Sequence, residues 1–278
     1  MNLDFSDDQK FLQEEARKFL EKENVLSRNR SVLENNANVD VELWNKIVEL
    51  GWTGIRIPEE YSGLGLGHLE LCVIAEELGR FLAPVPFSSS VYLFTEAIIN
   101  YANDDIKKEI LPKLVSGEVI GTLAVAEDLQ APTADNISLQ SDNNILNGKK
   151  IAVPDAEIAT HAIVVSKTSS GISLQLVDLN ADGVKIEKQE NIDESRGYFS
   201  ILFENSPSKL IGDETGGWDL YEALMNQAAV LFGYEQIGGS QAALDMAINY
   251  SKERYAFGRQ IGSFQAIKHK LADMYIAL

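Results

Sequence analysis

The spacing of apolar residues predicts that the first part of the chain is mostly helical. Apolar side chains recur every three or four residues after Ser6, and Ser6 and Gln9 have the spacing of a capping box, in which each side chain bonds the other's free backbone N–H. Similar spacing, with Gly51 as a helix cap, predicts helices over residues 41–50, 69–82, 91–101 and 104–115. We expect a helical segment over residues 1–118.

The pattern changes after Gly117 to short stretches rich in β-forming residues. They cover residues 119–126, 145–153, 161–166, 172–178, 184–188 and 198–203. The pairs Asn147-Gly148, Ser170-Gly171 and Asp182-Gly183 predict turns between them. Several short strands in one segment indicate a small β-barrel or sandwich over residues 119–206.

Helical spacing returns after Gly216-Gly217 and predicts one long helix, followed by a break at residues 258–262. A last helix then carries a narrow apolar stripe, which comprises Phe264, Ile267, Leu271, Met274 and Leu278. We expect residues 207–278 to be the first part of a helical bundle, and the whole chain to be an α+β multidomain protein. Because the chain stops while this pattern continues, we expect further residues or a partner to cover the stripe.

The charge of the chain argues against nucleic acid as a partner. Acidic residues outnumber basic ones by 42 to 24, for a formal net charge of -18, and such a surface repels phosphate backbones and anionic membranes. Cys72 is the only cysteine, so no internal disulfide is expected. The acidic start does not resemble a secretory signal, and no apolar run approaches the ~20 residues of a membrane span. We expect a cytoplasmic protein.

Two other patterns carry little chemistry. The glycines at 63, 65 and 67 lack the spacing and the βαβ context of a dinucleotide-binding fingerprint, so we expect a structural loop. The histidines at 68, 161 and 269 lie in three different segments. With one cysteine and no paired ligand spacing, a metal site is not expected.

The segment from Tyr250 to Lys270 is basic within an acidic chain. It contains five Lys or Arg residues and one Glu, a local charge of +4. Arginine there could bind a pyrophosphate through bidentate, charge-assisted hydrogen bonds. Alternatively, the charges are a solvated helix end that complements the helix dipole, and charge alone favours this interpretation.

A set of motifs distributed over the chain resembles the acyl-CoA dehydrogenase family. In the basic segment the matching residues are Arg254, Phe257-Gly258, Ile261 and Phe264-Gln265, followed by Leu271-Ala272-Asp273-Met274. Further matches, in the same order and place as in the family, are Leu50-Gly51-Trp52, Pro58-Glu59-Glu60-Tyr61, Gly63-Leu64-Gly65, Glu76-Glu77-Leu78-Gly79-Arg80, Leu146-Asn147-Gly148-Lys149-Lys150 and Gly212 to Trp218. The resemblance covers the chain from Phe5 to Leu278.

The resemblance implies FAD as cofactor and an acyl-CoA thioester as substrate. In the family, FAD lies across a subunit contact, and the residues matching Arg254, Phe257, Gly258 and Gln265 bind the flavin cofactor of the neighbouring subunit. The implied reaction is α,β-desaturation: a carboxylate removes an α-proton while the β-hydrogen leaves as hydride to the flavin. The resemblance also implies an external electron acceptor of the electron-transfer-flavoprotein type and a homo- or hetero-oligomer with a dehydrogenase paralogue.

The chain departs from the family where this subunit's own flavin would be contacted. The family's Thr-Glu-Pro and Gly-Ser-Asp turn corresponds here to Ala126-Glu127-Asp128 and Gln130-Ala131-Pro132, so only the Glu is retained. The family's Trp-(Ser/Thr) strand becomes Ala152-Val153-Pro154. The hydroxyl groups that would contact the flavin are absent, so we expect the chain alone to bind little FAD.

The family's catalytic base is also not found. One branch of the family carries a Glu early in the long helix, where this chain has Ala228 and Ala229, and the other branch carries it beyond residue 278. The Glu residues after Pro207 are Glu214, Glu222, Glu235 and Glu253, and none has the matching position. Three functions stay open: a dehydrogenase, a non-catalytic subunit that completes the FAD site of a paralogous partner, or an acyl-CoA-binding protein without redox activity.

Overall fold

The computed structural model describes residues 4–278, which form two compact units. Unit 1 combines the N-terminal residues up to 26 with residues 69–83 and 230–278. Unit 2 comprises residues 27–68 and 84–229. Each unit therefore joins segments that are distant in the sequence.

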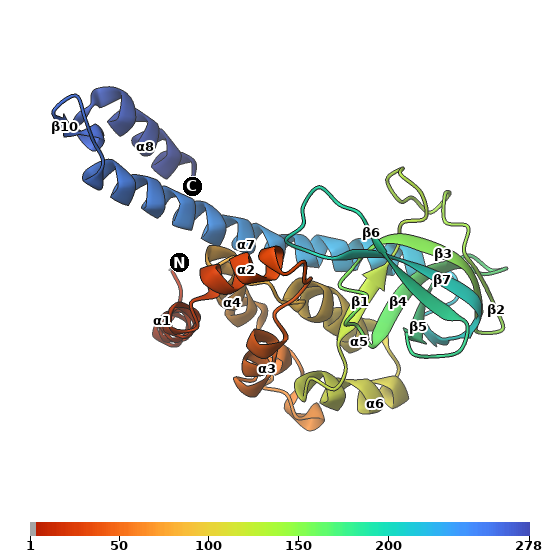
Figure 1. The fold of residues 1–278 in the computed structure, drawn as a ribbon. Coiled ribbons are helices and arrows are strands. Elements are labelled where there is room, and N and C mark those ends of the chain that lie inside the picture. Colours follow the sequence, from red (N-terminus) through yellow and green to blue (C-terminus); the bar gives the residue numbers. More distant parts are fainter. Residues whose placement is uncertain (1–3) are drawn as a thin grey trace. The chain divides into compact units, whose positions relative to one another are not determined.

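Unit 1 is almost entirely helical (Figure 1). Its elements are α1 (Asp7–Lys22), α4 (His68–Arg80), most of α7 (Gly217–Glu253), the short strands β9 (Tyr255–Ala256) and β10 (Arg259–Gln260), the 3-10 turn η4 (Ile261–Ser263) and α8 (Gln265–Ala277). The predicted capping box at the start of α1 is confirmed. The Ser6 hydroxyl accepts from the Gln9 backbone N–H at 3.2 Å, and the Gln9 side chain accepts from the Ser6 N–H at 2.9 Å.

Helices α4 and α7 touch backbone to backbone in unit 1. A Cβ added at Gly238 would lie 1.8 Å from the carbonyl oxygen of Glu76, and one at Gly79 would lie 2.1 Å from that of Glu235. The absence of side chains at these two glycines is what permits the contact. Close by, the carboxylate of Glu77, which is fully buried, accepts two hydrogen bonds from the Arg17 guanidinium at 2.6 and 3.0 Å.

The helices of unit 2 lie largely before its strands. They are α2 (Val25–Glu34), α3 (Val41–Glu49), the 3-10 turns η1 (Trp52–Gly54) and η2 (Glu59–Tyr61), the π-helix η3 (Ser88–Thr95), α5 (Glu96–Tyr101) and α6 (Asp104–Val115). Helix α6 has the predicted bounds, and the predicted helix over 91–101 corresponds to η3 and α5. Helix α2 was not predicted. Gly51, at φ +77°, follows the end of α3 as predicted.

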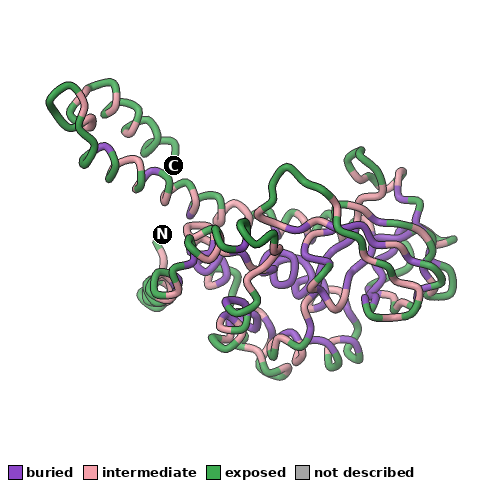
Figure 2. The backbone as a smooth tube through the Cα atoms, in the orientation of Figure 1, coloured by how far each residue is buried: buried purple, intermediate pink, exposed green. Residues whose placement is uncertain are grey.

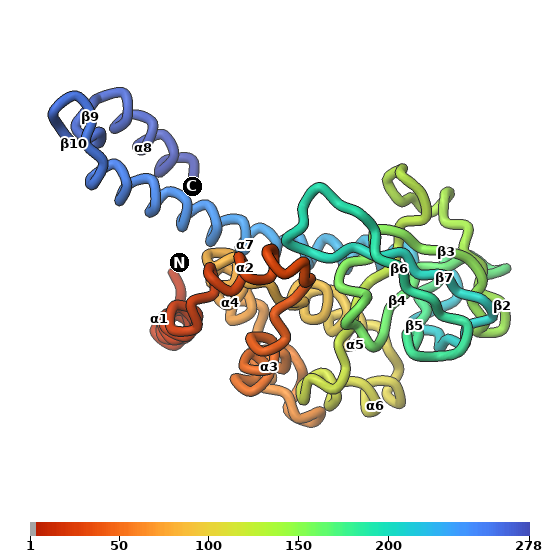
Figure 3. Tube along the Cα trace, in the orientation of Figure 1, coloured from red at the N-terminus to blue at the C-terminus, as the bar shows by residue number. Residues whose placement is uncertain are grey.

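The strands of unit 2 form one mixed sheet of eight strands. They are β1 (Gly121–Ala124), β2 (Gln140–Asp142), β3 (Ile145–Pro154), β4 (His161–Lys167), β5 (Ile172–Asp178), β6 (Val184–Gln189), β7 (Tyr198–Pro207) and β8 (Lys209–Ile211). The strand order is β6-β7-β3-β2-β4-β5-β8, and β1 pairs in parallel with β4. Figure 3 traces the path of the chain through this part of unit 2. Buried residues of β3, β4 and β7, such as Val153, Val164 and Phe203, form the core of the sheet.

One predicted turn is wrong. Asn147-Gly148 lies inside β3, where both residues pair with β7. The chain reverses earlier, at Asn143 and Asn144, whose φ values of +49° and +61° suit a two-residue hairpin turn. A register shift between Leu146 and Asn147 shows that the strand continues through a bulge rather than turning. The predicted turns at Ser170-Gly171 and Asp182-Gly183 lie between strands as expected.

The glycines at 63, 65 and 67 lie in the predicted structural loop before α4. Gly63 is required there by close packing, since an added Cβ would lie 2.0 Å from the carbonyl oxygen of Ile57. Gly65 has a φ of +60°, which a glycine adopts without strain. This loop therefore has a packing explanation that needs no nucleotide.

The succession of helices, a β segment and helices confirms the expected fold class. The boundaries 1–118, 119–206 and 207–278 remain a prediction. No helix among the described residues has the length and apolar character needed to cross a membrane.

Candidate functional site

The residues matched to the family's FAD contacts lie together at one end of unit 1. Helix α7 ends at Glu253, and the next residues form a hairpin in which Tyr255 pairs with Gln260 and Ala256 with Arg259. The turn consists of Phe257 at φ +53° and Gly258 at φ +78°. Two successive positive φ values define the tight hairpin turn whose twist matches that of the flanking strands.

The predicted contact residues point away from the core of the protein. The Phe257 side chain is 95% exposed, Arg254, Gly258 and Gln265 are also exposed, and no atom lies within 4 Å of a Cβ added at Gly258. Within residues 4–278 the Arg254 guanidinium makes no ion pair. Figure 2 shows the hairpin and α8 as mainly exposed. An unpaired guanidinium in the same short segment as an exposed aromatic residue could bind a phosphate-bearing aromatic ligand.

A second region, in unit 2, matches the turn with which family members contact the flavin of their own subunit. Glu127, the one retained residue of that turn, pairs with the ammonium of Lys150 at 2.6 Å. Lys150 also donates to the Val125 carbonyl at 2.8 Å, and Glu127 accepts from the hydroxyl of Ser138 and from the backbone N–H of Leu139. The Glu127 carboxylate is thus engaged in an ion pair and hydrogen bonds within unit 2.

This ion pair is buried, and burial changes how both groups titrate. The Lys150 side chain is fully buried, which lowers its pKa to about 8 although the nearby Glu127 raises it. Burial also raises the pKa of Glu127, but the hydrogen bonds from Lys150 and Ser138 outweigh that effect and leave its pKa below the usual value. Glu127 is therefore a structural anion.

The end of β3 that would face this subunit's flavin, Ala152-Val153-Pro154, is distorted and has no polar side chain. Ala152 has a φ of +51° at a bulge in β3, and its N–H donates to the side-chain oxygen of Gln189 at 2.7 Å. The Pro154 carbonyl accepts from the Thr122 hydroxyl at 2.6 Å. The side chains of Ala126, Ala152 and Pro154 carry no hydrogen-bonding group, so they do not fit the role of the family's flavin contacts.

No carboxylate occupies the place of the family's base on α7. Ala228 is fully buried, and Ala229 is exposed. Glu222 is exposed and accepts a hydrogen bond from the Trp218 indole at 3.0 Å. Glu235 lies on the part of α7 whose backbone touches α4 at Gly79. The base that the sequence left unassigned therefore stays unassigned.

The sequence does not single out one buried carboxylate, which lies before Pro207. Glu96, on α5, is fully buried and pairs with Arg56, whose Nε donates at 3.0 Å. The Gln227 amide donates to the same carboxylate at 2.6 Å, and Gln227 immediately precedes Ala228. The arginine neutralises Glu96, so we assign it a structural role. The partners of Glu96 lie far from it in the sequence, so no local motif indicates that this carboxylate is buried and paired.

Among residues 4–278 no three His, Cys, Asp or Glu side chains are grouped so that they could hold a metal ion. Burial raises the pKa of the Cys72 thiol to about 11, which keeps it protonated. His161 is half-buried beside Asp178, and burial lowers its pKa.

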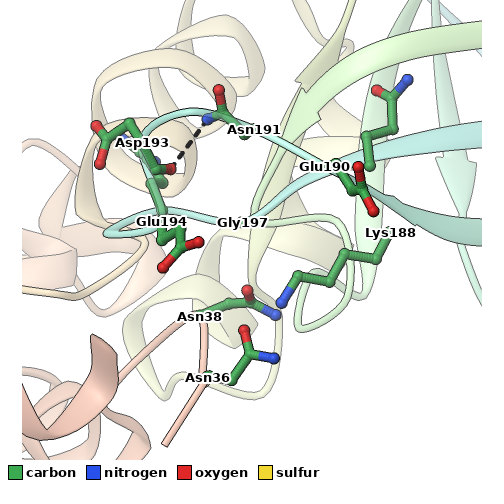
Figure 4. A pocket seen from close by; sticks show the side chains of 10 residues that line it. Asn36, Asn38, Lys188, Glu190, Asn191, Asp193, Glu194 and Gly197 are labelled. Atoms are coloured by element: carbon green, nitrogen blue, oxygen red, sulfur yellow. Dashed lines mark hydrogen bonds between the residues drawn. The ribbon is translucent and has the colours of Figure 1, made fainter. Parts of the chain in front are cut away.

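A polar cavity of about 490 Å³ opens in unit 2 beside the loop between β6 and β7 (Figure 4). Its lining combines amides with charges of both signs: Asn36, Asn38, Lys188, Gln189, Glu190, Asn191, Asp193, Glu194, Arg196 and Gly197. Without aliphatic or aromatic side chains it does not suit an acyl chain, and its three carboxylates disfavour a diphosphate. We assign it no ligand.

Comparison with known proteins shows the same order of segments as the structure. Residues 6–118 match the model of the "Acyl-CoA dehydrogenase, N-terminal domain" and residues 215–278 match that of the "Acyl-CoA dehydrogenase, C-terminal domain". The chain belongs to the acyl-CoA dehydrogenase family. Family members bind FAD.

The similarity to individual family members extends over nearly the whole chain. A mitochondrial 2-methylacyl-CoA dehydrogenase of Solanum tuberosum is 30% identical over 98% of this chain and 70% of its own length. A mitochondrial isovaleryl-CoA dehydrogenase of Pongo abelii is 31% identical, with coverages of 98% and 69%. The solved Tcur3481-Tcur3483 steroid ACAD variant is 29% identical with a TM-score of 0.85, over 97% of this chain and 73% of that one.

Proposed function

We propose that this chain is a subunit of an FAD-dependent acyl-CoA dehydrogenase assembly and completes the FAD site of a paralogous dehydrogenase chain. In this assembly Arg254, Phe257, Gly258 and Gln265 bind the FAD carried by the neighbouring chain. The observation that supports the proposal is the contrast between two surfaces. The hairpin presents an unpaired Arg254 and an exposed Phe257, whereas Glu127 is committed to Lys150.

The chemistry of the hairpin fits the cofactor. A guanidinium binds a pyrophosphate through two parallel, charge-assisted hydrogen bonds, and an exposed aromatic ring offers a face to a flavin or adenine ring. Gly258 leaves room for close approach, since no atom lies within 4 Å of a Cβ added there. The residues of this chain would hold and orient the cofactor, which supplies hydride acceptance when bound.

The reaction of the assembly is proposed to be α,β-desaturation of an acyl-CoA thioester. The base that removes the α-proton would come from the partner, because Ala228 stands where one family branch has its Glu. A base for such a weak acid must be a positioned carboxylate, and an alanine cannot replace it. An acceptor of the electron-transfer-flavoprotein type would take the electrons, and a cytoplasmic location is part of the same proposal.

A second candidate is that the chain itself is the dehydrogenase. The 31% identity to an isovaleryl-CoA dehydrogenase favours this candidate. In that case Glu222 and Glu235 are the carboxylates of α7 to test. Glu222→Gln or Glu235→Gln should then reduce desaturation with an artificial electron acceptor by several orders of magnitude, whereas the subunit proposal predicts no measurable activity of the chain alone.

The flavin content of the purified protein tests the proposal. We expect little FAD on the chain alone, and one FAD for each pair of chains when it is co-expressed with the product of a neighbouring dehydrogenase-like gene. Arg254→Ala should lower the FAD affinity of that complex, because the lost group serves the cofactor rather than the core. Lys252→Ala, which removes an equally exposed charge two residues away, should not. One FAD per chain in the lone protein, or unchanged flavin in the Arg254→Ala complex, would refute the proposal.

A further inference from the structure

Phe257 occupies a position that is unfavourable for the isolated chain. A bulky residue with a φ of +53° is a backbone outlier, and Phe257 as a whole is also 95% exposed to water. Asparagine or glycine would form the same turn with less strain. A strained backbone position of this kind persists only where the surrounding structure fixes it.

Two contacts outside the turn support the ring. The Phe257 ring meets that of Phe264 edge to face, with centroids 6.3 Å apart and an interplanar angle of 89°. On the Phe264 ring lies the guanidinium of Arg259, whose central carbon is 4.1 Å from the ring centroid. Arg259, Phe264 and Phe257 thus form a continuous stack, which we call the tip stack.

The tip stack stands on a closely packed base. The Ile261 N–H donates to the Arg254 carbonyl at 2.8 Å, which ties the returning strand to the end of α7. A Cβ added at Gly262 would lie 2.9 Å from both the carbonyl and the hydroxyl oxygen of Ser251, which is itself buried. The hairpin is therefore held at its base by close backbone packing and between its strands by backbone pairing, and the tip stack adds side-chain contacts at its turn.

We propose that Arg259 is a positioning residue for the cofactor contact: through Phe264 it fixes the Phe257 ring at the turn of the hairpin. This inference rests on the proposed function, in which Phe257 and Arg254 bind the FAD of the neighbouring chain. Arg259 is the charged side chain of the hairpin that the sequence did not select, because its charge is indistinguishable there from that of its basic neighbours. In the structure it lies against an aromatic face, a contact that its planar guanidinium makes well.

Lysine in place of Arg259 separates positioning from simple charge. Arg259→Lys keeps the positive charge but removes the planar group that covers the Phe264 ring. Arg259→Gln removes both. If Arg259 acted only through its charge, whether on the pyrophosphate or at long range, the lysine variant would retain the FAD affinity and the glutamine variant would lose it. If Arg259 instead positions the tip stack, both variants should lose FAD affinity to a similar extent.

The first measurement needs neither partner nor cofactor. 4-Fluorophenylalanine is placed at position 257 of the full chain, and its fluorine NMR relaxation reports the mobility of the ring. We expect increased mobility in Arg259→Lys and Arg259→Gln, and none in Lys252→Gln, which removes a nearby exposed charge outside the stack. A Phe257 ring that is as mobile in the wild-type chain as in the Arg259 variants would overturn the inference, whatever the function of the protein.

The second measurement is the FAD affinity of the complex with the co-expressed dehydrogenase chain. Both Arg259 variants should weaken FAD binding by about two- to fivefold, the range that one exposed cation–π contact supports. Lys252→Gln should leave it unchanged. Full affinity in Arg259→Lys would contradict positioning. If Arg254→Ala also left FAD binding unchanged, the proposed function would fail, while the relaxation data would still decide whether the stack exists.

Discussion

At the scale of single residues, the Glu127–Lys150 ion pair tests whether burial determines how much a charged pair affects stability. Glu127→Gln should destabilise the protein by about 3–5 kcal/mol at pH 7, because it leaves a buried ammonium without its counter-charge. Adding Lys150→Met should recover much of that loss. The exposed pair of Lys185 and Glu204 is the control, with side chains 63% and 53% exposed. Glu204→Gln should cost less than about 1 kcal/mol. Urea denaturation measures all three; equal losses at the two sites would contradict burial as the cause.

The same lysine predicts a dependence of stability on pH. Its pKa is about 8 in the folded chain, against a model-compound value of 10.5 for the unfolded one. Between these values the unfolded state binds more protons, so the contribution of Lys150 to stability should rise with pH. We expect the difference in free energy of unfolding between wild type and Lys150→Met to move in favour of wild type from pH 8 to 10. A difference that is constant over this range would show that the Lys150 pKa is not lowered.

The residue scale also shows what the sequence could and could not reveal. Arg254, Phe257, Gly258 and Gln265 lie within one short segment, so a linear motif contains them all and the structure places them together. The contact of Glu127 with Lys150 joins the bend after β1 to strand β3, and nothing in the local sequence predicts it. The retained glutamate therefore looked like a remnant of a flavin site until its partner was known.

At the scale of elements, the backbone contact between α4 and α7 should make Gly238 intolerant of any side chain. An added Cβ would lie 1.8 Å from the Glu76 carbonyl oxygen, so Gly238→Ala must push the helices apart and should destabilise by about 1–3 kcal/mol or more. Gly233→Ala is the matched control, since no atom lies within 4 Å of its added Cβ. It should stabilise α7 by up to about 1 kcal/mol through helix propensity. The midpoint temperature of thermal unfolding should therefore fall in Gly238→Ala and rise in Gly233→Ala. A shift of both variants in the same direction would argue against the contact.

Periodicity predicted most elements because their apolar faces are buried as the spacing requires. It failed where the pattern was short or ambiguous. β2 and β8 have three residues each, too few to show alternation. Helix α2 contains several Ser, Arg and Asn residues that obscure its apolar face. Asn147-Gly148 is a local turn signal, yet pairing of β3 with β7 on both sides of it holds the strand extended. Tertiary pairing outweighed local propensity there.

At the scale of the whole molecule, unit 1 keeps a large apolar surface open to solvent. No residue of α8 is buried, and Phe264, Ile267 and Leu271 of the predicted stripe are only half-buried. Met274 is 43% exposed, and outside the stripe Ile276 is 81% exposed. Burying one such side chain stabilises by about 1.5–3 kcal/mol. A surface with several of them in water favours association over a free monomer.

We therefore expect the protein to be at least a dimer, with α8 in the contact. Light scattering coupled to size exclusion should give a mass of two chains or more, and Ile276→Asp should shift it towards one chain, because a carboxylate in an apolar contact is strongly disfavoured. Leu129→Asp is the control: Leu129 is fully exposed, but it lies in a loop of unit 2. Its substitution should leave the mass unchanged, and both variants should keep the circular dichroism of the wild type. A stable wild-type monomer would refute the assembly, and equal effects of the two substitutions would place the contact away from α8.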